Sequence, residues 1–119
     1  MKQYTNKEQT KCLIELGFPK PNLVDVEGVL FSTLTKYYAT GKDEYENDVC
    51  YDNYSIGELI EFLGMHLMGI HPTTVCDLPI IYVVQYQRDP KKLAYKEIQG
   101  ELIDKLYEAC VELKNEGVI

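Results

Sequence analysis

The stretch Ile98-Gln-Gly-Glu-Leu-Ile-Asp-Lys-Leu-Tyr-Glu-Ala-Cys-Val-Glu-Leu113 decides the predicted fold. Its apolar residues recur at gaps of three and four, which places them on one stripe of an amphipathic helix. Gly117 follows as a C-terminal stop, because glycine enters the left-handed conformation at little cost. The helix is predicted over 92–116, with Gly100 as a weak point inside it. A helix with one apolar stripe needs a surface to lie on.

The run Leu78-Pro-Ile-Ile-Tyr-Val-Val-Gln-Tyr-Gln87 is the expected surface. It is continuously apolar and rich in β-branched and aromatic residues, which is typical of a buried strand. We therefore expect a central strand over 79–87 that is buried on both faces, or nearly so.

Two motifs mark the starts of other helices. Thr5-Asn-Lys-Glu8 and Ser55-Ile-Gly-Glu58 both have capping-box spacing, in which a hydroxyl accepts from a helical N–H and the acid bonds back. The remaining elements are predicted as helices 6–16 and 55–67 and strands at about 23–31, 34–38 and 44–51. The stretch 29–38 also fits a helical stripe, although a hairpin with 44–51 is favoured.

This pattern predicts a single α+β domain over residues 1–119. Three amphipathic helices and one-sided strands favour three helices packed on one face of a small, mainly antiparallel sheet. The expected core consists of Leu13, Leu16, Val24, Val26, Leu59, Leu63, Ile81, Val83, Leu102, Leu106 and Cys110.

Composition narrows the function classes. The net charge of −7 argues against non-specific binding to nucleic acid and to anionic membranes, both of which require a basic face. The four cysteines are widely spaced and the first residues do not resemble a signal peptide, so we expect reduced thiols and a cytoplasmic location. No phosphate-binding loop or nucleophile motif is present, and no cofactor is expected.

Ten tyrosines and no tryptophan favour a binding surface, because tyrosine suits half-buried, wet interfaces. The leading hypothesis is a non-catalytic protein-binding or adaptor module whose partners include a second copy of the chain. Its candidate contact residues are Tyr37, Tyr38, Tyr45, Tyr51 and Tyr54.

A second hypothesis is a metal-binding protein or small enzyme. It would use His66, His71, Cys76 and Asp77, whose atoms suit zinc. Residues five apart do not share a helix face, so exposed or hydrogen-bonded histidines are the simpler interpretation.

Charged clusters carry the remaining hypotheses. An acidic stretch could imitate nucleic acid in a partner's basic groove, whereas a solubilising acidic surface is the simpler interpretation. Its carboxylates are Asp43, Glu44, Glu46, Asp48 and Asp52. The densest basic patch either forms a solvated surface or contacts an anion, and it comprises Arg88, Lys91, Lys92 and Lys96.

Three segments carry a family resemblance: Lys7-Glu-Gln-Thr-Lys-Cys-Leu-Ile-Glu-Leu-Gly-Phe18, Tyr54-Ser-Ile-Gly-Glu-Leu-Ile-Glu61 and Glu101–Ile119. They cover about a third of the chain and resemble small uncharacterised proteins encoded by phages and mobile elements of gut bacteria. The resemblance implies an opening helix, strands, a middle helix, further strands and a closing helix. It implies no activity and no catalytic residue.

Overall fold

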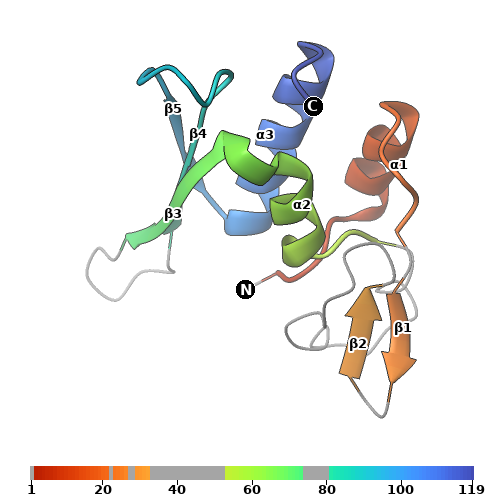
Figure 1. Ribbon diagram of the computed structural model, residues 1–119. Helices are drawn as coiled ribbons and strands as arrows, with labels where there is room; N and C mark the ends of the chain where they lie inside the picture. The colour runs from red at the N-terminus through yellow and green to blue at the C-terminus, as the bar shows by residue number, and fades with distance from the viewer. Residues whose placement is uncertain (1, 22, 27–28, 33–52, 74–80) are drawn as a thin grey trace.

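A computed structural model describes residues 2–21, 23–26, 29–32, 53–73 and 81–119 of the protein (Figure 1). Its elements in chain order are α1 Lys7–Glu15, β1 Leu23–Val26, β2 Val29–Ser32, α2 Ile56–Leu63, the 3₁₀ turn η2 Gly64–His66, β3 Leu67–Thr73, β4 Ile81–Tyr86, β5 Lys96–Gly100 and α3 Leu102–Asn115. The predicted α+β class is confirmed.

β4 is the centre of an antiparallel sheet with the order β3-β4-β5, which confirms the predicted central strand. Val83 and Val84 are adjacent, so they point to opposite faces, and both are buried. Ile81 was expected in the core but is 43% exposed. It is the first residue of β4 and pairs with Thr73, the last residue of β3, so it lies at the end of the sheet.

α3 packs against β4 and β5, and α2 packs against α3. In Figure 1 the sheet, the α2–α3 pair and α1 follow one another across the molecule. The predicted stripe of α3 is buried, from Leu102 through Leu106 to Leu113. Among the described elements, α3 is therefore the helix that packs extensively against this sheet.

The predicted helix over 92–116 is wrong in its first part. Gly100 has φ 158°, a conformation that side chains rarely adopt, and it is the last residue of β5, directly before the N-cap Glu101 of α3. Residues 96–100 extend the sheet beside β4, although Ile98 still packs against the core as the stripe requires.

The predicted helix over 55–67 also ends early. Gly64 takes φ 53° directly after Leu63, and after η2 the chain forms β3, a strand that the sequence did not predict. The strand forms because β4 offers its free edge and because Leu67 and Ile70 pack against the core.

The predicted strand over 23–31 is two strands, β1 and β2, paired antiparallel. The predicted strands at 34–38 and 44–51 lie outside the described residues, as do the side chains of Val24 and Val26.

The first capping box is formed by other residues than predicted. Asn6 and Gln9 cap α1 reciprocally, at 2.7 and 3.0 Å, in place of Thr5 and Glu8. Thr5 is instead buried, and its hydroxyl accepts from the N–H of Tyr54 at 3.0 Å. The Ser55–Glu58 box of α2 is confirmed.

The rest of the predicted core is largely confirmed. The residues found buried are Leu13, Leu59, Leu63, Val83, Leu102, Leu106 and Cys110. Leu16 is partly buried and packs against this core.

Candidate interaction surface

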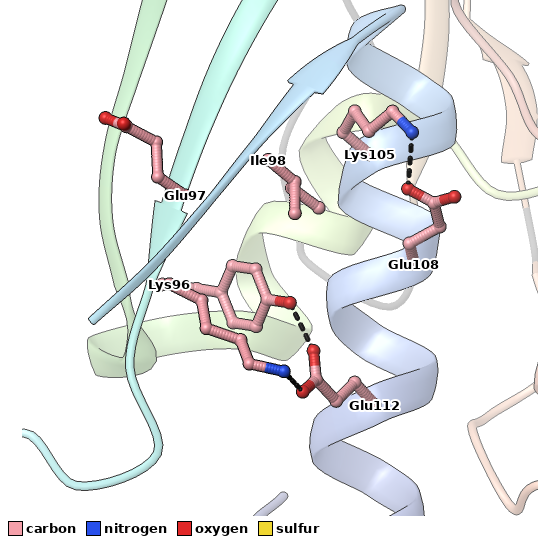
Figure 2. A pocket seen from close by; sticks show the side chains of 7 residues that line it. Lys96, Glu97, Ile98, Lys105, Glu108 and Glu112 are labelled. Carbon is pink, nitrogen blue, oxygen red and sulfur yellow. Dashed lines mark hydrogen bonds and ion pairs between the residues drawn. The ribbon is translucent and has the colours of Figure 1, made fainter. Parts of the chain in front are cut away.

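Glu112 of α3 holds two groups from the sheet. The Tyr86 hydroxyl donates to one carboxylate oxygen, and the Lys96 ammonium pairs with the other. Tyr86 and Lys96 are opposite each other in the β4–β5 register, so neighbouring strands deliver both groups to one carboxylate. Figure 2 shows Lys96 reaching across to Glu112. This contact fastens the β4–β5 hairpin to α3.

The pKa shifts in this cluster follow from burial and from its own hydrogen bonds. Burial raises the pKa of the Tyr86 hydroxyl, and its hydrogen bond to Glu112 raises it further. Burial acts upward on the pKa of Glu112, but the hydrogen bonds from Lys96 and Tyr86 outweigh it, and the pKa lies below the ordinary value. Tyrosine stays protonated and glutamate ionised at neutral pH, which does not suit a proton-transfer pair.

Two further ion pairs lie along the same side of α3. Arg88 binds Glu116 through two guanidinium nitrogens, and Lys105 pairs with Glu108 at 2.7 Å. The hydrogen bond from Arg88 lowers the pKa of Glu116. Such exposed pairs are individually weak, but here Arg88 anchors the chain directly after β4.

The predicted basic patch is therefore divided. Arg88 and Lys96 are paired with glutamates, whereas Lys91 and Lys92 are exposed. In the described part of the chain, neither of these two lysines forms an ion pair.

The segment between β4 and β5 forms an ordered turn. The Asp89 carboxylate accepts from the N–H of Lys91 at 2.9 Å, and the Asp89 carbonyl accepts from the N–H of Lys92 at 3.0 Å. This turn presents Leu93 at 95% exposure and Tyr95 at 52%.

Met65 and Met68 lie at the same end of the sheet, exposed by 75% and 47%. The register places the start of β3 beside the end of β4 and the start of β5, through Leu67 opposite Tyr86. In addition, the Gln87 N–H donates to the His66 carbonyl at 2.8 Å. We call the four exposed side chains the apolar end: Met65, Met68, Leu93 and Tyr95.

A hollow of about 360 Å³ lies beside the apolar end, between the turn and α3. Tyr86, Ala94 and Tyr95 contribute to its wall together with Lys92. Glu112 of α3 contributes to the opposite side of this hollow.

The histidines of the metal hypothesis both have protein partners. The Nδ1 atom of His66 lies 3.0 Å from the carbonyl oxygen of Gln87, and Nε2 of His71 lies 3.3 Å from Oε1 of Gln85. Among the described residues, no group of three or more His, Cys, Asp or Glu side chains could hold a metal ion. Cys76 and Asp77 lie outside the described residues.

Tyr54 is completely buried, so its side chain is not part of the exposed surface. Its hydroxyl donates to the carbonyl of Pro19 at 2.5 Å, and burial followed by the charge of Glu58 raises its pKa to about 12. The four other candidate tyrosines and the acidic stretch lie outside the described residues: Tyr37, Tyr38, Tyr45 and Tyr51, and Asp43, Glu44, Glu46, Asp48 and Asp52.

Cys110 is a core residue rather than a nucleophile. Burial raises the pKa of its thiol to about 12, so the reactive thiolate is scarce at neutral pH.

Sequence reasoning missed Leu93 and Tyr95 because it placed them within a predicted helix over 92–116. Asp89-Pro90 indicates the turn over 88–92 and Gly100 a weak point in the predicted helix, but neither signal shows that residues 93–95 lie outside a helix.

The chain matches no family model, no curated protein and no solved structure in the comparisons made. In the part of the chain that is described, no helix combines the length and apolar composition needed to cross a membrane.

Proposed function

We propose that this protein is a non-catalytic protein-binding module that contacts its partner through the apolar end. The observation that carries the proposal is the gathering of Met65, Met68, Leu93 and Tyr95 at one end of the sheet. Single exposed apolar residues are ordinary, whereas a group at one site is typical of interaction surfaces. Methionine and tyrosine are both enriched in such surfaces.

The ion pairs behind the turn support the same proposal. Arg88 and Lys96 flank the turn in sequence, and each is held by a glutamate of α3. A surface that is already ordered loses less conformational entropy when it binds. Binding at this turn would therefore require little additional ordering of its backbone.

The titratable groups support a non-catalytic role. The shifted pKa values lie further from neutral pH than the ordinary ones. Those of Tyr86 and Cys110 are raised, and those of Glu112 and Glu116 are lowered. General acids and bases work best with pKa values near the working pH.

The test is affinity capture with matched variants. Wild-type protein, the double variant Leu93→Ser/Tyr95→Ser and the variant Ile81→Ser would be immobilised and exposed to lysate of the organism that encodes the chain. Ile81 is a suitable control because it is also exposed but lies at the opposite end of β4. We expect quantitative mass spectrometry to find proteins enriched by wild type and Ile81→Ser but not by the double variant. Equal enrichment by all three would contradict the proposal.

A second copy of the chain is among the proposed partners. Light scattering during size-exclusion chromatography would reveal it as a mass above the 13.7 kDa of one chain. If self-association uses the apolar end, the double variant should elute as a monomer while Ile81→Ser should not.

A further inference from the structure

The charge around Leu93 is opposite to that of the protein as a whole. The chain carries a net charge of −7, but residues 88–96 contain four basic residues and one acidic residue. Two of the four cations, Arg88 and Lys96, are neutralised by glutamates of α3. Lys91 and Lys92 are exposed, with no ion pair among the described residues, and together they exceed the single negative charge of Asp89, so the turn keeps a small excess of positive charge.

These two lysines directly precede the most exposed large apolar side chain among the described residues. Leu93 is 95% exposed, and the backbone before it is held by Asp89, which accepts from the N–H groups of Lys91 and Lys92. The turn therefore presents one apolar side chain and two cations together.

We infer that the turn binds an amphipathic protein segment whose apolar side chains are flanked by carboxylates. This inference rests on the proposed function and adds the chemistry of the partner. Burying Leu93 needs an apolar contact on the partner. Because Lys91 and Lys92 enter the same interface, the partner must also place acidic groups beside that contact, or the two charges would be desolvated without a counter-charge. A basic partner would repel both lysines.

An anionic membrane fits less well than a protein segment. A bilayer surface is extended, so it would also face the carboxylates responsible for the charge of −7. A short acidic segment can contact the turn alone, because charges beyond about 10 Å are largely screened at 0.1 M salt.

The test uses two fluorescein-labelled synthetic peptides and fluorescence anisotropy. One peptide is an amphipathic helix of leucine and glutamate, and the other has lysine in place of every glutamate. Bulk attraction to an acidic protein would favour the lysine peptide, whereas the inference predicts that the turn favours the glutamate peptide.

The variants separate the contributions of the turn. We expect the glutamate peptide to bind wild type and to bind at least about tenfold more weakly to Leu93→Ser and to Lys91→Glu/Lys92→Glu. The matched control Lys11→Glu/Lys20→Glu makes the same charge change at exposed positions outside the turn and should bind like wild type. Circular dichroism would verify that each variant is folded.

Three results would overturn the inference. They are no binding of the glutamate peptide to wild type, an equal loss in the Lys11→Glu/Lys20→Glu control, and Leu93-dependent binding to vesicles of phosphatidylserine and phosphatidylcholine in place of the peptide. Lysate capture distinguishes this failure from failure of the proposed function. If capture is lost in Leu93→Ser/Tyr95→Ser but not in Lys91→Glu/Lys92→Glu, the proposed binding function stands and the inference of an acidic partner is wrong.

Discussion

The turn between β4 and β5 has a base, where strand pairing ends at Tyr86 and Lys96, and a tip, and similar side chains have opposite environments in the two. At the base, Tyr86 is buried and bonded to Glu112, and Lys96 is paired with the same carboxylate. At the tip, Tyr95 is half exposed and Lys92 has no ion pair among the described residues. Two tyrosines and two lysines of one hairpin thus have different roles.

The difference shows that residue type alone does not decide whether a side chain stabilises the fold or is available to a partner. At the base, α3 supplies carboxylates within reach of the sheet (Figure 2). At the tip, Leu93 is almost wholly exposed, so it gains little from the fold. If this comparison is correct, substitutions at the base should destabilise the protein and substitutions at the tip should not.

The largest loss of stability is expected at Leu106, on the α3 helix that packs against the sheet. This side chain is fully buried in the middle of the α3 stripe, and Leu106→Ala leaves a cavity in the core. We expect a loss of about 2–5 kcal/mol in the free energy of unfolding, measured by urea denaturation. An unchanged midpoint would mean that α3 does not pack on the sheet as described.

A smaller loss is expected for Tyr86→Phe, which removes only the hydroxyl that donates to Glu112. The carboxylate is partly accessible and can bind water, so we expect a cost of about 1–2 kcal/mol in urea denaturation. Tyr95→Phe makes the same change at the tip and serves as the control. Equal effects of the two substitutions would remove the distinction between base and tip.

The pH dependence of stability should report on Glu112. Its pKa is lowered in the folded protein, so it contributes stability that is present above its unfolded pKa of about 4.3 and is lost as the pH falls through the folded pKa. Glu112→Gln should therefore be less stable than wild type at pH 7, and the gap should narrow toward pH 3. Urea midpoints measured across this range would test it, and a constant gap would show that the Glu112 charge does not stabilise the base.

The smallest effect is expected at the tip, where Leu93→Ser should change the free energy of unfolding by less than about 0.5 kcal/mol. The side chain is almost wholly exposed and so has little burial to lose. A thermal melt of dilute protein would measure it. A loss above about 1 kcal/mol would place Leu93 in the packing of the fold rather than on a free surface.

Local patterns predicted the elements whose signals are contained in their own residues. The stripe of Leu102, Leu106 and Leu113 follows helical spacing, and the apolar run around Val83 predicted the central strand. The Ser55–Glu58 box was predictable because both partners are one turn apart. The α+β class follows from such patterns without any long-range contact.

The candidate surface was predicted only in part. The sequence identified Arg88, Lys91, Lys92 and Lys96 as a basic patch, but it did not show which cations are paired. Lys96 binds a carboxylate sixteen residues away on another element, and nothing in the residues around Lys96 indicates that partner.

Sequence by itself determined the amphipathic closing helix, the buried central strand and the charge pattern, because these depend on periodicity and composition. Tertiary structure alone decided that 96–100 and 67–73 are strands, because each depends on hydrogen bonds to β4 across the sheet. It also decided that Leu93 is exposed, whereas the helical stripe had already predicted that Leu106 is buried. Both leucines lay within one predicted helix, and Gly100 and the pairing of β5 with β4 separate them in the fold.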